Sequence, residues 1–400
     1  MRYNWPEVKL SELCSYRQER VAVDELTVEN YISTANMLPN KGGIEPTESL
    51  PSSSTANRYY AGDVLISNIR PYFKKAWYAT TDGGCSSDVL VLRAKGDVHP
   101  EFLYYLLTSD TFFSYMTATS KGTKMPRGDK QAIMNWRARK PPLPTQRAIA
   151  DTLSCLDAKI ALNKRINENL EEQAQAIFKS WFVDFEPFRN GESIDSDLGM
   201  IPKGWRVGKL GELGTIVGGA TPRKSNKEFY EKQEIPWITP KDLSIQRTTF
   251  VSRGEVDISE KGLENSGVKL IPRGAVLFSS RAPIGYMAIA KNPLGTNQGF
   301  KSVVPLKEFG TPFIYNLLRA YLPRIQALGS GSTFKEVSGS VMRSVPVIVP
   351  DLQYVQNYNA LVQPMYDLIE TLESENQILA ALRDTLLPKL MSGEIEVPVV

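Results

Sequence analysis

The chain has 400 residues, of which 42% are apolar and 23% charged, as expected for a folded protein of two to three domains. Lys and Arg number 47 against 44 Asp and Glu, so binding to a polyanion would depend on local basic patches rather than on the net charge of +3. No uncharged apolar stretch reaches the length of a membrane-spanning helix, and the first residues lack the apolar region of a secretory signal.

The few cysteine and histidine residues limit which catalytic and metal-binding sites the chain could contain. Cys14, Cys85 and Cys155 lie far apart and form no CxxC pair, which indicates reduced thiols in a cytoplasmic protein and no zinc site. A Ser-His-Asp or Cys-His site could use only His99, which lies in a polar, turn-like stretch and is interpreted as a solvated residue. No complete P-loop and no G-x-G-x-x-G motif is present, so the sequence argues against an enzyme and predicts no catalytic or metal-binding residues.

The first part of the chain has the pattern of a mixed α/β domain. Short runs rich in β-branched and aromatic residues predict strands at 63–69, 76–81 and 89–93, and a helical pattern follows at 102–107. Residues 38–57 contain several Pro, Ser and Thr residues and are expected to form an exposed loop.

A long helix is predicted next, over about residues 152–182. Thr145, which follows Pro144, has a hydroxyl that can cap free N–H groups at a helix start, and the pattern stops at Glu186-Pro187. The polar, turn-rich segment 190–199 is typical of a linker.

The second half of the chain repeats the first. The W-x3-K-L-x-E-L pattern that begins at Trp5 recurs at Trp205, and Gly62–Pro71 matches Gly274–Pro283 with its arginine moved by one position. Matched blocks in the same order indicate a duplicated unit. Strands are accordingly predicted in the second copy at 276–279, 286–290 and 301–304.

A second long helix closes the repeat, predicted over about residues 358–391. Asp351, after Pro350, is its predicted N-cap, and Ser392-Gly393 ends the pattern.

Both long helices place apolar residues at alternating steps of three and four, the spacing of a coiled-coil seam. A helix of roughly 30 residues spans about 45 Å, and a single apolar stripe of that length needs a partner. We therefore predict that the two helices pack against each other, the alternative being two ordinary core helices in one large domain. The residues predicted to pack in this contact are Leu156, Ile160, Leu170, Ile177, Trp181, Met365, Leu372, Leu379 and Leu386. The same stripe of the second helix includes Leu361, Leu368 and Leu382.

The predicted fold class is α+β, with two pseudo-symmetric mixed α/β domains separated by two long helices packed as an antiparallel coiled coil. The predicted boundaries are 1–144 for the first mixed domain, 145–187 for the first helical spacer, 188–200 for a linker, 201–349 for the second mixed domain, and 350–400 for the second helical spacer with the C-terminal tail.

Basic, aromatic and small polar residues gather in both halves and could contact nucleic acid. Lys121–Lys140 contains seven basic residues against Asp129 alone, which could neutralise several phosphates. Arginine and amide side chains are the groups that read base edges. A solvated basic face is the alternative for any one residue. The candidate DNA-binding residues are Arg58, Arg70, Lys74, Lys75, Lys121, Thr123, Lys124, Arg127, Thr221, Arg223, Lys224, Arg281, Gln298, Ser332, Thr333 and Lys335.

Several long blocks resemble the specificity subunits of type I restriction–modification enzymes, and the resemblance covers essentially the whole chain. The second proline–glutamine block, Val349–Gln353, is shorter than the first, which is Pro141–Gln146. The blocks that carry the resemblance are Pro141–Ile149, Leu156–Lys164, Asn167–Glu171, Phe178–Pro187, Ile201–Trp205 and Leu382–Glu394.

The resemblance implies a division of labour. Each mixed domain would be a target recognition domain that reads one half of a split double-stranded DNA site. The helices would fix the gap between the half-sites and dock two modification methyltransferase subunits, which motor/restriction subunits would join. The chain itself would be non-catalytic and bind no cofactor, since S-adenosylmethionine, ATP and Mg are implied on the partner subunits. The complex would be cytoplasmic, without membrane association.

Three other classes of protein are alternatives. A stand-alone nucleic-acid-binding protein with a coiled-coil dimerisation element would share the basic clusters but need no partner subunits. A fused restriction enzyme would need catalytic motifs that the sequence lacks. A purely structural coiled-coil protein would leave the duplicated mixed domains without a role.

Overall fold

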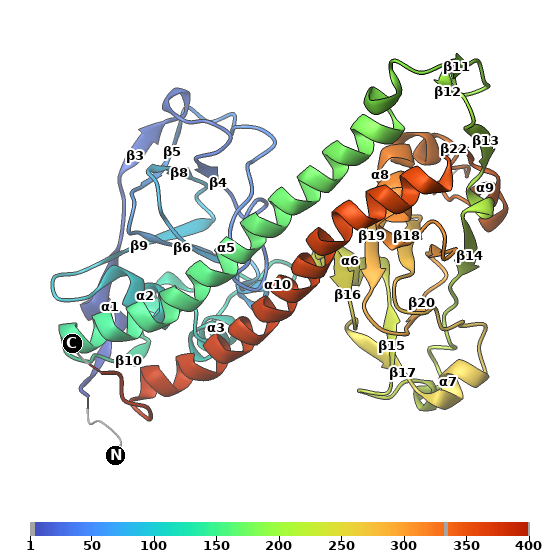
Figure 1. Cartoon of the computed structure of the whole chain (residues 1–400). Coiled ribbons are helices and arrows are strands. Elements are labelled where there is room, and N and C mark those ends of the chain that lie inside the picture. Colours follow the sequence, from blue (N-terminus) through green and yellow to red (C-terminus); the bar gives the residue numbers. More distant parts are fainter. Residues whose placement is uncertain (1–4, 332–334, 399–400) are drawn as a thin grey trace. The chain divides into compact units, whose positions relative to one another are not determined.

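The computed structural model describes residues 5–331 and 335–398, and the chain divides into two compact units. Unit 1 consists of residues 1–160 and 377–400, and unit 2 of residues 161–376. Each unit contains a mixed α/β domain and a segment of each of two long helices, α5 (Leu143–Phe182) and α10 (Leu352–Ser392) (Figure 1).

The mixed domain of unit 1 is built on two four-stranded sheets. The first sheet is antiparallel in the order β2-β9-β6-β7, and the second has the order β3-β5-β8-β4 with β4 parallel to β8. A two-stranded ribbon pairs β1 with β10. The strands are β1 Glu7–Lys9, β2 Cys14–Tyr16, β3 Arg20–Ala22, β4 Tyr31–Ile32, β5 Thr55–Tyr59, β6 Val64–Ser67, β7 Ala76–Tyr78, β8 Gly83–Cys85, β9 Val89–Ala94 and β10 Arg137–Arg139. The helices are α1 Leu10–Leu13, α2 Pro100–Leu107, α3 Asp110–Ala118 and α4 Lys130–Asn135, with 3₁₀ turns η1 Val23–Glu25 and η2 Pro71–Phe73.

The mixed domain of unit 2 has a five-stranded sheet in the order β14-β21-β18-β19-β16 and a three-stranded sheet in the order β17-β15-β20. Short ribbons pair β13 with β22 and β11 with β12. The strands are β11 Ser193–Ile194, β12 Ile201–Pro202, β13 Arg206–Lys209, β14 Gly214–Gly218, β15 Ile235–Ile238, β16 Phe250–Val251, β17 Val256–Ile258, β18 Val276–Ser280, β19 Ile284–Ala290, β20 Gly295–Thr296, β21 Lys301–Pro305 and β22 Pro346–Val349. The helices are α6 Pro240–Gln246, α7 Glu260–Glu264, α8 Thr311–Ala327 and α9 Gly339–Ser344, with η3 Glu186–Phe188, η4 Leu210–Glu212 and η5 Lys227–Phe229.

The duplication predicted from the sequence is confirmed in the hydrogen bonds. The ribbon β1–β10 of unit 1 pairs Lys9 with Arg137, and the ribbon β13–β22 of unit 2 pairs Lys209 with Pro346. The next residue of each copy, Leu10 or Leu210, donates its N–H to a matching carbonyl at 2.8 or 2.9 Å. The α+β class with two related mixed domains is therefore confirmed.

The two copies differ in the helix that covers the main sheet. Unit 1 has a break between α2 and α3, where Ser109 caps α3 by accepting the N–H of Phe112 at 3.3 Å. The corresponding position of unit 2 falls at Ala320, inside the continuous α8. A serine that can cap a helix start favours the break, whereas alanine has the highest helix propensity.

The long helices begin earlier than predicted. α5 starts at Leu143 rather than near residue 152, so Thr145 lies within the first turn and is not the N-cap. α10 starts at Leu352, and Asp351 accepts the N–H of Gln353 at 2.9 Å, which confirms Asp351 as the cap. The turns that the prediction left out also bury apolar residues in the domain cores, namely Ile149 of α5 in unit 1 and Val355 of α10 in unit 2.

A buried glutamine joins the start of α5 to the mixed domain of unit 1. The Gln146 amide accepts the N–H of His99 at 2.9 Å and donates to the carbonyls of Asp97 and Pro141 at 3.2 and 2.9 Å. In unit 2 the equivalent clamp is made by Asn359, which accepts the N–H of Phe313 at 3.1 Å and donates to the carbonyl of Phe309 at 2.7 Å. The shortened second proline–glutamine block thus coincides with a change of clamping residue. His99 is partly buried here, so its interpretation as a solvated residue was wrong.

Within each unit the two long helices lie side by side and antiparallel (Figure 1). In unit 1 the guanidinium of Arg383 donates to Asp157 at 2.6 Å. In unit 2 the Asn163 amide donates to Glu375 and Asn376 at 2.7 and 2.9 Å. In these contacts, higher residue numbers on α5 lie beside lower residue numbers on α10. The predicted antiparallel packing is therefore confirmed.

The apolar stripe of α10 that becomes buried is different from the predicted one. Leu361, Leu368 and Leu382 are 48%, 42% and 44% exposed, so their prediction as seam residues was wrong. The buried face of α10 in unit 2 contacts both α5 and the mixed domain, which rotates the contact away from these leucines. The buried residues of α10 in unit 2 are Val355, Tyr358, Val362, Tyr366, Ile369 and Leu372.

The residues predicted to pack between the long helices are partly buried, apart from Leu372, which is buried. Ile177, Trp181 and Met365 pack against the core of unit 2, and Leu386 packs against the core of unit 1. The remaining four are only partly buried, namely Leu156, Ile160, Leu170 and Leu379. On α5 the fully buried positions include Asn163, Ala174 and Phe178, so the seam combines amides with small and aromatic residues.

Replacing Gln146 with alanine should destabilise unit 1. The variant leaves one buried N–H and two carbonyls without their partner, and each such loss costs about 1 kcal/mol or more, so we expect a total of roughly 2–3 kcal/mol. Urea unfolding followed by circular dichroism measures the change. Gln353→Ala removes the exposed glutamine of the second block and should change the free energy of unfolding by less than about 0.5 kcal/mol. Equal effects of the two substitutions would contradict the clamp.

Candidate nucleic-acid interface

A loop and a hairpin meet at one edge of the main sheet of unit 1. The loop connects β6 to β7, and the hairpin runs from Lys121 to Arg127, whose backbones exchange two hydrogen bonds of 2.8 Å. Arg70 N–H donates to the carbonyl of Pro126 at 2.8 Å, and Gly128 N–H donates to that of Asn68 at 3.0 Å. Backbone pairing therefore brings together candidates that are about 50 residues apart in the sequence.

Three of the basic side chains of this surface are paired with carboxylates. Lys121 contacts Asp129 at 2.5 Å, and this hydrogen bond is the main reason why the pKa of Asp129 is lowered. Further ion pairs join Lys74 to Asp110 at 2.7 Å and Arg127 to Asp88 at 3.0 Å. Lys75 donates to the carbonyl of Thr34 at 2.6 Å. Thr123 and Lys124, at the tip of the hairpin, are exposed.

Two aromatic side chains stand out from the same loop. Tyr72 and Phe73 are 49% and 40% exposed, and their ring centroids lie 4.8 Å apart. Exposed rings beside basic groups can stack on bases or pack against sugars, which a purely basic patch cannot do. The sequence showed these aromatics between the basic residues, but their exposure depends on the 3₁₀ turn Pro71–Phe73.

Arg58 does not take part in this loop–hairpin contact. It lies on β5 in the second sheet of unit 1, pairs with Glu25 at 2.9 Å and lies 5.7 Å from the ring of Tyr60. These contacts hold Arg58 within its own sheet.

Unit 2 repeats the loop–hairpin contact with different side chains. Arg281 and Ser330 both form β-bridges to Glu336, and Val337 N–H donates to the carbonyl of Ser280 at 3.0 Å. These bridges match those of Ile69 and Lys121 to Arg127 in unit 1. Arg281 therefore corresponds to Ile69 rather than to Arg70, and the apparent shift of the arginine in the repeat is a real difference in position.

A carboxylate neutralises the second surface. Glu336 pairs with Arg281 at 3.5 Å and with Lys301 at 3.3 Å. Lys301 and Glu336 were not predicted from the sequence, because neither residue has a residue of the same charge at the matching position of the first copy. Aligning the bridges rather than the residue types would have revealed both.

The remaining candidates of unit 2 lie on loops. Thr221 donates a hydrogen bond to the exposed Gln298, which joins two of them. Arg223, Lys224 and Lys335 are exposed. Ser332 and Thr333 lie outside the described residues.

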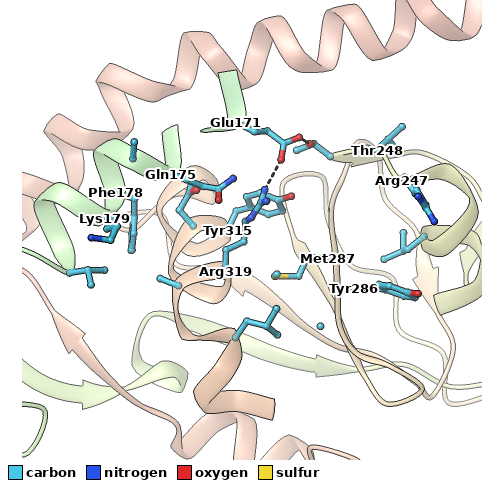
Figure 2. Close-up of a pocket in the computed structure, with 18 of the residues that line it drawn as sticks. Glu171, Gln175, Phe178, Lys179, Arg247, Thr248, Tyr286, Met287, Tyr315 and Arg319 are labelled. Carbon is cyan, nitrogen blue, oxygen red and sulfur yellow. Dashed lines mark hydrogen bonds and ion pairs between the residues drawn. The ribbon is translucent and has the colours of Figure 1, made fainter. Parts of the chain in front are cut away.

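Each unit also has a groove beside the end of a long helix. In unit 2 the groove measures about 810 Å³ and is lined by the C-terminal part of α5, by α8, by the loop around Arg247 and by the start of β19 around Tyr286. Figure 2 shows Glu171 and Arg319 pointing toward each other in this groove, with Met287 and Tyr286 further along it. In unit 1 a groove of about 590 Å³ lies beside the C-terminal part of α10. Leu387 there occupies the place that Phe178 has in unit 2, so the grooves belong to the repeat.

Two glutamates of the long helices hold the mixed domain of unit 2. Glu171 of α5 accepts a hydrogen bond from the Thr249 hydroxyl and pairs with Arg319 at 2.5 Å. Glu373 of α10 accepts the N–H groups of Thr249 and Phe250 at 2.7 and 3.0 Å. The pKa of Glu373 is raised to about 7, mainly by burial and to a smaller degree by the nearby Glu171 charge, while the two backbone N–H groups and Lys291 act in the opposite direction.

Within residues 5–331 and 335–398, no group of three or more His, Cys, Asp or Glu side chains is placed to hold a metal ion. In the same part of the chain, none of the helices combines the length and the apolar character needed to cross a membrane.

Comparison with known proteins identifies the class of this arrangement. The family model of the type I restriction modification DNA specificity domain matches residues 3–172 and again 202–384. The chain is 27% identical over 461 aligned positions to the HindI specificity subunit of Haemophilus influenzae, with 98% of the chain and 100% of that protein covered. It is 39% identical over 190 residues to the MjaIX specificity subunit of Methanocaldococcus jannaschii, an alignment that covers 47% of the chain and 44% of that protein.

A solved structure supports the fold. The type I restriction–modification S subunit of M. genitalium superimposes with a TM-score of 0.58 at 16% identity, covering 97% of the chain and 96% of that subunit.

A duplicated DNA specificity domain with paired helices defines the recognition components of restriction–modification systems. The chain belongs to the type I family of these specificity subunits. Such subunits are non-catalytic, since catalysis resides in other subunits of the complex, and the chain is accordingly not an enzyme in its own right.

The raised pKa of Glu373 gives a testable pH dependence. An ordinary glutamate has a pKa of 4.5, so between pH 4.5 and about 7 the unfolded chain loses this proton before the folded chain does. Stability from this group is therefore full below pH 4.5 and declines as the pH rises to about 7. Relative to Glu373→Gln, the wild type should lose roughly 2–3 kcal/mol between pH 4.5 and pH 8.

Urea unfolding of both proteins at several pH values measures the difference. Parallel stability curves for wild type and Glu373→Gln would contradict the burial argument.

Proposed function

We propose that the chain recognises a bipartite double-stranded DNA sequence, with the mixed domain of each unit reading one half-site as a target recognition domain. The observation that carries the proposal is the loop–hairpin contact made by equivalent backbone bridges in both units. Reading two different half-sites requires the same backbone framework in both units, with different side chains on it. The identical framework presents each set of side chains in the same way.

The loop–hairpin surface of unit 1 has the composition of a DNA contact. Ion-paired lysines and arginines can exchange a carboxylate for a phosphate as DNA binds, and exposed residues such as Lys124 can contact phosphates directly. Arg70, Tyr72 and Phe73 offer groups suited to base edges and base faces. In unit 2 the amide of Gln298, near Thr221, is a candidate for pairing with adenine.

We further propose that α5 and α10 set the gap between the half-sites. The pairing of Asn163 with Glu375 and Asn376 supports a fixed register, because a buried amide loses its partners when the helices slide. Domain boundaries at 144, 187, 200 and 349 remain our proposal for where each recognition domain gives way to a helical spacer.

The partners proposed are two modification methyltransferase subunits and motor/restriction subunits, which would carry S-adenosylmethionine, ATP and Mg. The matched grooves of the two units support two copies of one partner. The exposed leucines of α10 support helix docking, because large apolar side chains repeating on one face favour burial by another helix. The assembled complex would work in the cytoplasm.

The gap-setting role predicts the effect of an insertion. Four residues added to α5 lengthen the helix by about 6 Å, and successive bases are about 3.4 Å apart along a strand. We expect the gap between methylated half-sites to grow by one or two base pairs while both half-site sequences stay the same. Sequencing of methylated DNA from cells that express the variant with its methyltransferase measures the gap.

The wild type serves as the reference and should give a two-part methylated motif. A single uninterrupted motif would end the bipartite proposal. A two-part motif whose gap ignores the insertion would end only the role of the helices.

The docking role predicts the effect of charge on the exposed face of α10. The double variant Leu361→Glu and Leu368→Glu should weaken methyltransferase binding by roughly 30- to 1,000-fold, at about 1–2 kcal/mol for each of the two leucines that a partner buries. Isothermal titration with purified methyltransferase measures the affinity. Gln356→Glu adds an exposed charge to the same helix and should leave the affinity within about twofold. Unchanged binding by the double variant would show that the partner docks elsewhere.

A further inference from the structure

Two buried polar atoms on one loop of unit 1 have no partner. Among the described residues, the Nε atom of Arg70 and the Oδ1 atom of Asn68 are buried and make no hydrogen bond. Buried polar atoms in folded proteins are nearly always satisfied, so each exception calls for a reason. Both atoms lie in the connection between β6 and β7, two residues apart.

The backbone that presents Arg70 is strained and fixed. Arg70 has a φ of 50° and a ψ of 63°, a left-handed conformation that non-glycine residues seldom adopt outside functional positions. The hairpin holds this conformation through the N–H of Arg70, which donates to Pro126 at 2.8 Å. A Cβ on Gly128 would lie 2.8 Å from Asn68 Oδ1, so the hairpin approaches the loop as closely as glycine allows.

Arg70 differs from three of its basic neighbours in having no anion. Lys74, Lys121 and Arg127 are each paired with an aspartate, at 2.7, 2.5 and 3.0 Å. In the part of the chain that the structure describes, the side chain of Arg70 makes neither a hydrogen bond nor an ion pair. An arginine that is held in position and left unpaired is ready to donate to a ligand.

The matched place in unit 2 is satisfied internally. Ser280, which corresponds to Asn68, donates to the carbonyl of Gly299 at 3.1 Å and accepts from Lys301 at 3.4 Å. Ala282 has the same left-handed backbone as Arg70, with a φ of 50°, but its side chain has no donor. The adjacent Arg281 is held by Glu336. As far as the described residues extend, only the first of the two matched loops therefore has buried polar atoms without a partner.

We propose that Arg70 is the specificity-determining residue that reads a guanine in the half-site of unit 1. The two-donor fork of an arginine matches the O6 and N7 acceptors of guanine in the major groove, and this match depends on a fixed approach of the side chain. A phosphate accepts from many directions, whereas a guanine edge accepts the fork only from one, and the backbone bond to Pro126 limits the directions from which Arg70 can approach. Unit 2 reads its half-site without an arginine at the matched position. The inference rests on the proposed function, that each unit reads one half-site.

The test uses the complete complex of the chain with its methyltransferase subunits. Each guanine of the methylated motif is replaced in turn by 7-deazaguanine, which lacks the N7 acceptor, and initial rates of methylation are measured. In the wild type, replacing one guanine of one half-site should lower the rate about 10- to 100-fold, as expected for loss of an arginine–guanine pair.

Two substitutions connect that guanine to Arg70. Arg70→Ala should lower the rate on the unmodified duplex by a similar factor and remove the further effect of 7-deazaguanine at that position, while the other half-site keeps its pattern. Arg70→Lys keeps the charge but loses the fork, so it should follow Arg70→Ala at that guanine. Arg20→Ala removes an arginine that is bonded within its own sheet and should leave the whole pattern unchanged.

Two results would overturn the inference. One is an Arg70→Ala complex with the same 7-deazaguanine pattern as the wild type. The other is an equal loss of rate on every duplex, with full recovery in Arg70→Lys, which indicates a phosphate contact. Thermal unfolding of each variant identifies a folding defect, in which case Arg70→Lys with wild-type stability decides the matter. A wild-type motif without two parts would instead contradict the proposed function.

Discussion

The constraint on which the structure depends is the burial of one face of two long helices. Each helix has an apolar face that water would cover if the helix stood alone, and in each unit that face packs against both the other helix and a mixed domain. Ring contacts illustrate this in unit 2, where Phe178 lies 5.7 Å from Tyr358 of α10 and 5.5 Å from Phe313 of α8. The same side chain thus stabilises helix pairing and the attachment of the domain.

Polar contacts fix the position of each long helix against its mixed domain, which apolar packing alone would leave adjustable. Apolar surfaces can slide with little cost, whereas the Gln146 and Asn359 clamps and the contacts of Glu171 and Glu373 are made in one position only. The two clamps use different amides from different turns of the helices. The repeat has therefore kept the requirement for a clamp while changing the residue that meets it.

Much of the fold follows from the sequence because it depends on local patterns and on internal repetition. The matched tryptophan blocks predicted the duplication, and the three- and four-residue spacing predicted two long helices. The buried face of α10 was mispredicted because Leu361 and Leu368 satisfy the seam spacing as well as Tyr358 and Val362 do. Spacing identifies apolar stripes, but only the shape of the neighbouring domain decides which stripe is buried. The Gln146 clamp likewise depends on contacts distant in sequence.

The candidate site was predictable in outline. Basic residues separated by aromatics marked the loop and hairpin of unit 1, but the unpaired state of Arg70 depends on the placement of Asp88, Asp110 and Asp129 around it. The role of Glu336 in unit 2 was hidden, because a lone carboxylate has no signal until Arg281 and Lys301 are seen to converge on it. Ion pairs between residues of different loops depend on the tertiary structure and cannot be read from local sequence patterns.

The buried amides of the helix pair have a consequence for how such a chain can change in length. Asn163 is 0% exposed and donates to the side chains of Glu375 and Asn376, so any residue brought opposite these amides must supply a polar group. Because an α-helix turns once in 3.6 residues, adding one or two residues would rotate aliphatic side chains onto these amides, whereas three or four nearly restore the original face. Viable descendants of this protein would thus differ in discrete steps of about a helical turn rather than along a continuum.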